Sequence, residues 1–428
     1  MNIARLSWKN LTDKPLNMAL SLILFALGVG LISLLFLLEK QLQEKFDKNL
    51  AGIDLVIGAK GSPLQLILSS MYHIDSPTGN ISLEEARPFM RPDHPLIGEA
   101  IPVSLGDSYQ SYRIVGTDHR LVGLYAGKLA EGRLWEGDFE VTIGASIARE
   151  LGLKMGDKFK SSHGFVHDDD LEHGDAQSFQ VVGILAPSGA VIDQLILTNT
   201  QSIWKVHGEH AESEGAADDH DHEAHEHAEG EHAEEGAAPG DLSAESGGEI
   251  TALLVKYKTR NFQTLNLPRN INENTDLLAA TPAIELNRIY ARLGVGMDAL
   301  QVLALVIVVV SGLSIFISLF SSLKDRKYEL AWMRVMGATP GKVFLMIILE
   351  GLLLAVSGYV LGIALSHFGM EVLAGFMKES YRYSLTGAVF MWQEVAILAG
   401  ALLVGFLAAV IPAIQASNAD ISTTLAQR

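Results

Sequence analysis

The chain has 428 residues, of which 48% are hydrophobic and 19% are charged, and its formal net charge is −18. This composition is typical of a membrane protein that carries a water-soluble part large enough to bury a core of its own. The chain contains no cysteine, which excludes disulfide bonds and a cysteine nucleophile.

Four apolar segments are long enough to cross a hydrocarbon core of about 30 Å. None of them contains Lys or Arg, as expected because a charge inside the membrane is costly. The first is longer than the apolar core of a signal peptide and has no convincing cleavage site after it, so we interpret it as a retained anchor. The predicted transmembrane helices are residues 16–38, 299–323, 343–367 and 395–414.

Lys and Arg are distributed unevenly on the two sides of these helices. Residues 1–15 carry three of them and residues 324–342 carry five, whereas residues 368–394 carry two, together with three Glu. Cytoplasmic loops of membrane proteins are enriched in Lys and Arg. We therefore predict that these two basic segments and the tail 415–428 are cytoplasmic. Residues 39–298 and the short loop 368–394 are then on the opposite side of the membrane.

The large extracytoplasmic segment is predicted to be a mixed α/β domain. Short β-branched runs bounded by Gly, Asp or Pro indicate strands, and longer runs with helical spacing indicate helices. The predicted strands are 54–58, 112–116, 140–144, 179–185, 195–198 and 251–257. The predicted helices are 39–49, 63–72, 145–151 and 282–294, of which the first and last continue the adjacent membrane helices as a stalk.

Residues 207–249 differ from the rest of this domain. They contain seven of the fourteen His, fifteen Asp or Glu, and no Lys or Arg, so they hold most of the net negative charge. Low hydrophobicity with high charge predicts a disordered insert. One interpretation is a weak site for Zn²⁺, Ni²⁺ or Cu²⁺, because several imidazoles could reach one ion. The other is a solvated spacer. The candidate metal ligands are His220, His222, His225 and His227.

A second polar group of His, Asp and Glu lies at residues 163–175, and we interpret this segment as a hairpin between two strands. It has the same two interpretations, a metal site or a polar loop, and the loop is favoured.

No catalytic motif is present in the chain. The segment 337–343 resembles part of a phosphate-binding loop, but its spacing is wrong and Val343 replaces the hydroxyl residue that would bind magnesium. Gly-x-Ser-x-Gly and His-Glu-x-x-His are also absent. We therefore expect no enzyme activity and no bound cofactor in this chain, and any ATP chemistry must come from a partner.

The basic segment 324–342 is the most informative part of the sequence. It is short, partly helical in pattern, and held between two membrane helices, so it is a place where a cytoplasmic motor could act. Glu350 lies inside the following helix, where it is either a relay for protons or substrate or a hydrogen-bonded packing residue. Gly358 and Gly362 form a small-xxx-small pattern that favours close helix packing.

Together these features resemble the FtsX/MacB-like permeases of ABC transporters, a family that includes lipoprotein-releasing permeases. The resemblance covers nearly the whole chain outside 207–249. The segments that carry it are 326–339, Glu350-Gly351, 411–425, 140–144, 148–157 and 181–185 with Asp193.

The resemblance implies a MacB periplasmic core-like domain on four transmembrane helices, in the bacterial inner membrane. It implies a second permease copy, as a homodimer or heterodimer, and a separate cytoplasmic ATPase subunit that binds ATP. A periplasmic adaptor or substrate-binding protein and membrane lipids are further expected partners, and nucleic acid is not. The residues expected to couple the permease to the ATPase are Arg326, Glu329, Arg334 and Gly337.

Two functions from different classes follow. The first is a permease that uses ATP hydrolysis by its partner for export, extraction or efflux of a substrate, with a link to zinc through the His-rich insert. The second is an FtsX-like protein that transmits mechanical force to a periplasmic partner. The large extracytoplasmic domain, 39–298, favours the first. A stand-alone zinc-binding protein explains none of the cytoplasmic motif.

Overall fold

The computed structural model describes residues 6–7, 9–10, 15–161, 178–206, 242, 247–381 and 385–418. The chain divides into two compact units. The membrane unit consists of Met1–Gln43 and Ala291–Arg428, and the β unit consists of Glu44–Tyr290. Both division points fall inside long helices.

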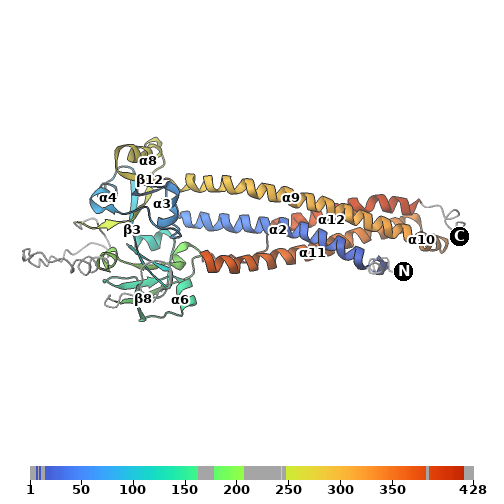
Figure 1. The fold of residues 1–428 in the computed structure, drawn as a ribbon, viewed down its shortest axis with the longest axis horizontal. Coiled ribbons are helices and arrows are strands. Elements are labelled where there is room, and N and C mark those ends of the chain that lie inside the picture. The colour runs from blue at the N-terminus through green and yellow to red at the C-terminus, as the bar shows by residue number, and fades with distance from the viewer. Residues whose placement is uncertain are drawn as a thin grey trace, which may run out of the picture. The chain divides into compact units, whose positions relative to one another are not determined.

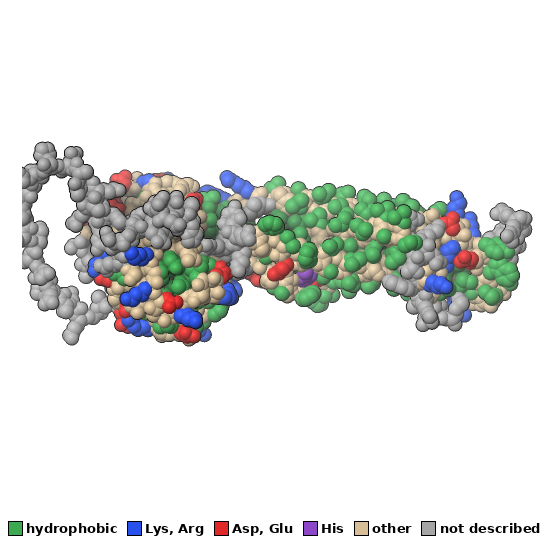
Figure 2. All heavy atoms as spheres, turned by 60° about the horizontal axis from the view of Figure 1, so that its bottom comes forward, with side chains coloured by type: hydrophobic (Ala, Val, Ile, Leu, Met, Phe, Trp, Pro, Cys, Tyr) green, Lys and Arg blue, Asp and Glu red, His purple; other side chains and the backbone are tan. Residues whose placement is uncertain are grey.

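The membrane unit contains four helices that are long and apolar enough to cross a membrane. They run side by side (Figure 1), and hydrophobic side chains cover the face of this unit that Figure 2 shows. This confirms the prediction of four membrane helices, with a short fifth helix, α10, between the second and third. The bounds are α2 Pro15–Leu50, α9 Pro282–Asp325, α10 Lys327–Val335, α11 Pro340–Tyr381 and α12 Trp392–Ser417.

Small residues allow the membrane helices to approach closely. A Cβ atom added at Gly362 would lie 2.8 Å from the carbonyl oxygen of Ala26, and one added at Gly405 would lie 2.6 Å from the Cβ of Ala355. The predicted small-xxx-small pattern therefore lies at the contact between α11 and α2, because Gly358 also faces a side chain of α2, Phe25. Glycine is required at these places for steric reasons.

The β unit is built on one mixed sheet of ten strands. The strand order is β12-β1-β11-β3-β4-β9-β6-β8-β5, with β7 paired to β8. The pairs β4–β9 and β6–β8 are parallel and the others are antiparallel. The bounds are β1 Leu55–Ala59, β3 Ile97–Tyr109, β4 Tyr112–Thr117, β5 Leu129–Gly132, β6 Glu140–Ile143, β7 Lys158–Phe159, β8 Phe179–Leu185, β9 Ile196–Thr198, β11 Ala252–Tyr257 and β12 Leu277–Ala280.

Helices pack on this sheet and a two-stranded ribbon lies beside it. The register of β1 places Ile57 opposite Leu253 of β11 and Ala279 of β12, and all three side chains are buried. The ribbon pairs β2 Ile81–Ser82 with β10 Glu249–Ile250. The helices are α3 Pro63–Ser70, α4 Leu83–Met90, α5 Arg120–Leu124, α6 Ala145–Leu151, the 3-10 turn η2 Val191–Gln194 and α8 Phe262–Asn274.

The predicted strands and helices of this domain are all present, with ends shifted by a few residues. The mixed α/β fold class is therefore confirmed. Several shorter or less regular elements were not predicted, among them β3, α4, α8 and β12.

Two segments that were predicted as a loop and as a disordered insert contain regular or buried structure. The loop 368–394 was expected to begin where the third membrane helix ended, but α11 continues as a helix to Tyr381. The insert 207–249 was expected to be disordered throughout, but Glu249 belongs to β10 and Leu242 is buried. The indole nitrogen of Trp204 donates a hydrogen bond to the carbonyl oxygen of Glu249 at 2.6 Å, because packing on the β unit overrides the polar composition at this end.

Candidate functional site

The candidate site is the short helix α10 with the turns on either side of it. Helix α9 ends at Asp325, and Arg326 has a non-helical backbone (φ −104°, ψ 13°) that starts α10 in a new direction. The site lies wholly within the membrane unit.

A Schellman motif ends α10. Gly337 has a positive φ of 99°, its N–H donates to the carbonyl oxygen of Arg334 at 3.1 Å, and the N–H of Ala338 donates to that of Met333 at 3.0 Å. This pair of hydrogen bonds requires a left-handed residue, and glycine adopts that conformation without strain. Pro340 then starts α11. The Gly-Ala-Thr-Pro sequence thus specifies a sharp turn between two helices.

A buried carboxylate joins three parts of the membrane unit beside this turn. Glu350 of α11 is only 4% exposed. Its Oε1 atom accepts a hydrogen bond from the side-chain amide of Asn10 at 2.7 Å and lies 3.6 Å from the guanidinium of Arg326. The Nε atom of Arg326 also donates to the carboxylate of Glu329 at 3.2 Å. The geometry fits the packing interpretation of Glu350, because a buried charge needs such partners.

The other end of α10 is attached to α12. The guanidinium of Arg334 donates to the carbonyl oxygen of Ser417 at 3.4 Å, in the last turn of α12. A positive charge at this place also interacts favourably with the negative end of the dipole of α12. In addition, the hydroxyl of Ser7 donates to the carbonyl oxygen of Met346 at 3.2 Å. The N-terminal segment, α9, α11 and α12 are therefore all connected to the α10 region.

The structure thus places the four predicted coupling residues on one short element. Arg326 and Glu329 form an ion pair in the first turn, and Arg334 and Gly337 lie at its end. Sequence reasoning missed Asn10 and the contact with α12. No local pattern connects Asn10 with Glu350 or Arg334 with Ser417, because these pairs are 340 and 83 positions apart in the sequence.

Apolar side chains cover the outer face of α10. Leu330 and Ala331 are buried against the other helices, whereas four large apolar residues on the opposite side are between 43% and 74% exposed. Their spacing of four, three and one residues places them on one face of a helix. Exposed apolar surface of this kind marks an interaction site. We name it the α10 stripe, and it consists of Tyr328, Trp332, Val335 and Met336.

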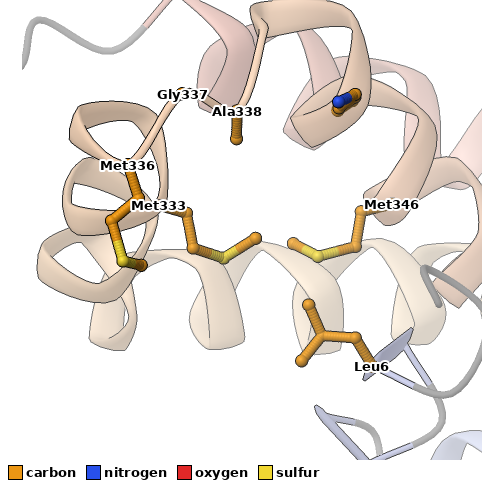
Figure 3. Close-up of a pocket in the computed structure, with 7 residues that line it drawn as sticks. Leu6, Met333, Met336, Gly337, Ala338 and Met346 are labelled. Carbon is orange, nitrogen blue, oxygen red and sulfur yellow. The ribbon is translucent and has the colours of Figure 1, made fainter. Parts of the chain in front are cut away.

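A cavity of about 230 Å³ adjoins the α10 stripe (Figure 3). Methionine side chains from α10 and from α11 point into it, and Leu6 of the N-terminal segment lies on the opposite wall. Methionine is unbranched and flexible, so such a wall adapts to different apolar groups. The lining residues are Leu6, Met333, Met336, Gly337, Ala338, Lys342 and Met346.

The predicted metal ligands lie outside the described residues. This applies to His220, His222, His225 and His227 and also to the polar group at 163–175. Within the described part of the chain, no cluster of three or more His, Cys, Asp or Glu side chains could hold a metal ion.

Comparison with known protein families gives two matches. Residues 302–421 match the FtsX-like permease C-terminal model, and residues 18–219 match the MacB-like periplasmic core domain model. The first match contains the whole of α10, and the second contains most of the ten-stranded sheet. No curated protein matches the chain.

Proposed function

Because the chain belongs to the FtsX/MacB-like family of ABC transporter permeases, we propose that it couples ATP hydrolysis by a separate cytoplasmic subunit to movement of its β unit. In this proposal the β unit is periplasmic, the membrane is the bacterial inner membrane, and the substrate is exported, extracted or expelled. A second permease copy completes the complex.

The observation that carries this proposal is the α10 stripe. Four large apolar side chains in a segment rich in Lys and Arg are exposed on the single chain, and such a surface favours a covering partner. The covering partner we propose is the ATPase. The cavity beside the stripe adds adaptable apolar surface to the same interface.

The connections of α10 support its role as a transmission element. A push on this helix acts on α9 through Arg326, on α11 through Glu350, and on α12 through Arg334. A displacement there would be shared by three of the four membrane helices. The same arrangement would serve an FtsX-like mechanical signal to a periplasmic partner, but the large β unit favours transport.

We further propose that the His-rich insert binds zinc weakly, which would link the transporter to metal homeostasis. Its support is compositional: seven His and fifteen acidic residues within 43 positions. Neutral imidazole binds the ion and protonated imidazole does not. Zinc binding by the full chain should therefore weaken as the pH falls through about 6.5.

The coupling proposal is tested by measuring ATP hydrolysis of the reconstituted permease–ATPase complex. Trp332→Ala should weaken binding of the ATPase and lower permease-stimulated hydrolysis several-fold, because aromatic residues contribute strongly to interfaces. Trp392→Ala is the matched control, since Trp392 is also largely exposed but lies at the start of α12, away from α10. Equal ATPase binding and equal stimulation in both variants would contradict the proposal.

A further inference from the structure

The cavity beside α10 lies where the apolar part of α11 begins. Its walls come from α10 and the turn after it, from the first two turns of α11, and from the N-terminal segment. The two residues of α11 that line it are Lys342 and Met346, and the uninterrupted apolar run of this helix starts between them, at Val343. A membrane helix enters the hydrocarbon core where its charged residues give way to such a run. The cavity is therefore at the level of the lipid headgroups.

The interior of the cavity is apolar. The ends of Met333 and Met346 point toward each other across it, and Ala338 and Leu6 lie on the walls to either side (Figure 3). Its volume is about 230 Å³, whereas about 15 Å³ is enough for one water molecule. Water is held in a cavity by polar partners, and these side chains offer none. A flexible apolar occupant suits walls of methionine better, because methionine adapts its shape to the group that it contacts.

One cation lines this apolar cavity. The side chain of Lys342 is exposed, and its ammonium group has no ion-pair partner within the part of the chain that the structure describes. By contrast, Arg326 already faces the carboxylate of Glu350. The segment 324–342 carries five Lys or Arg and two acidic residues, so the charge around the cavity is positive. Lys342 is therefore available to an anion that comes from outside the chain.

We propose that this cavity is a lipid site, which takes one acyl chain of an anionic phospholipid and holds its phosphate on the ammonium group of Lys342. A phospholipid presents an acyl chain and a phosphate together at the depth where the cavity lies. Inorganic phosphate has no apolar part with which to fill the cavity. Basic pockets between membrane helices at the headgroup level are suited to such lipids.

The other occupant to consider is an apolar side chain of the ATPase. The lipid is favoured because the cavity adjoins the first apolar turn of α11 and because Lys342 adds a charge that matches a phosphate. The lipid site does not depend on the coupling proposal. Met336 belongs both to the cavity and to the α10 stripe, so a bound lipid would form part of the surface that the ATPase covers.

The test measures lipid binding to the purified full chain by native mass spectrometry. The chain is released from detergent micelles after titration with phosphatidylglycerol or with phosphatidylcholine of the same chain length. We expect one molecule of phosphatidylglycerol to bind several-fold more tightly than phosphatidylcholine, because only the former carries a net negative charge. Inorganic phosphate at millimolar concentration should not displace it, since the acyl chain contributes to binding.

Two variants separate the headgroup from the acyl chain. Lys342→Gln should abolish the preference for phosphatidylglycerol. Lys327→Gln is the matched control, because it removes the same charge from an exposed residue that does not line the cavity. Ala338→Leu should lower the affinity for both lipids at least tenfold, because the larger side chain fills the cavity. If Ala338→Leu does not fold, Leu6→Phe fills the cavity from the opposite wall and replaces it.

Three results would overturn the lipid site. The first is equal binding of the two lipids by the parent chain, and the second is a preference for phosphatidylglycerol that persists in Lys342→Gln. The third is unchanged lipid binding in the cavity-filling variant, and a simultaneous loss of ATPase binding would then assign the cavity to a side chain of the ATPase. Trp332→Ala, which tests the coupling proposal, should leave lipid binding unchanged because Trp332 does not line the cavity. The two proposals can therefore fail separately.

Discussion

The side chain of Asn10 connects the N-terminal segment to α11. Its side-chain amide donates a hydrogen bond of 2.7 Å to the buried carboxylate of Glu350, whereas the guanidinium of Arg326 lies 3.6 Å from that carboxylate. Through this contact the N-terminal segment is fixed to α11, although the two are separated by most of the chain.

Asn10→Ala should therefore destabilise the membrane unit by about 1–3 kcal/mol, since a buried acceptor would lose its donor. Thermal unfolding in detergent measures this effect. Asn266→Ala on the exposed face of α8 is the control and should change the unfolding temperature little. An equally small effect at Asn10 would mean that water replaces the amide.

The pKa values of two residues in the β unit predict how the stability of this unit depends on pH. Burial, followed by the charge of Arg113, lowers the pKa of His73 to about 3. The hydrogen bond from Arg133 lowers the pKa of Glu140 to about 2 against the raising effect of burial. Both groups bind protons more weakly in the folded protein than in the unfolded chain, so stability rises with pH across each interval.

Acidification should therefore destabilise the β unit in two stages. Protonation of His73 in the unfolded chain lowers stability from about pH 6.5 downward, and protonation of Glu140 adds a loss from about pH 4.5 downward. His73→Asn should reduce the first stage and keep the second. Part of the first stage should remain, because burial and then the charge of Lys258 also lower the pKa of His94. Asn is chosen because His73 has a φ of 54°, which Asn tolerates. Thermal unfolding of the full chain at a series of pH values distinguishes the two stages, and a first stage of unchanged size in the variant would contradict the assignment to His73.

At the scale of elements, the turn after α10 is fixed by its backbone conformation. Proline at Gly337 cannot adopt a φ of 99° and has no N–H for Arg334. Gly337→Pro should cost the α10 turn about 3 kcal/mol or more and abolish stimulation of the ATPase, while the β unit remains folded.

The matched control for this change is Gly400→Ala. Gly400 lies inside α12 with no atom near its Cβ position, so alanine should be neutral or slightly stabilising there. ATP hydrolysis and a protease digest of the β unit, measured together, separate a coupling defect from general misfolding. Normal stimulation in the proline variant would show that the turn is not required to transmit force.

How well each helix or strand could be predicted depended on how clear its local sequence pattern was. Strands such as β8 are short, contain β-branched residues and end two residues before a proline, and the sequence predicts them well. Helices α4 and α8 each contain an internal proline, Pro88 and Pro268, and a proline within a segment is more typical of a loop than of a helix. They form because their caps and buried faces outweigh that penalty. The long strand β3 contains Pro102 and two glycines, so its alternation is broken.

The residues of the candidate site that share a clear local pattern could be predicted, and their distant partners could not. Arg326, Glu329, Arg334 and Gly337 lie within twelve positions and next to a clear glycine–proline stop signal. The partners that fix them, such as Asn10 and Ser417, are brought there by tertiary packing.

At the scale of the molecule, the membrane unit depends on the close approach of its helices. Gly362 contacts both Ala26 and Val29 of α2, whereas Gly375 of the same helix has no atom near its Cβ position. Gly362→Leu should separate α2 from α11, with a cost of about 1–3 kcal/mol or more from overpacking. Gly375→Leu should be tolerated. The yield of monodisperse protein in detergent and its unfolding temperature measure the difference, and equal losses at the two glycines would argue against tight packing between these helices.

The indole of Trp204 has a consequence for the length of chain that the β unit can accommodate between residues 206 and 249. Its hydrogen bond to Glu249, together with its position over Gly248, brings the residues on the two sides of the His-rich insert next to each other. A stretch inserted at such a point changes the length of the chain without displacing any strand, and longer loops add little to the cost of closure. We therefore expect that the chain between this point and the buried Leu242 can be shortened while the β unit keeps its fold.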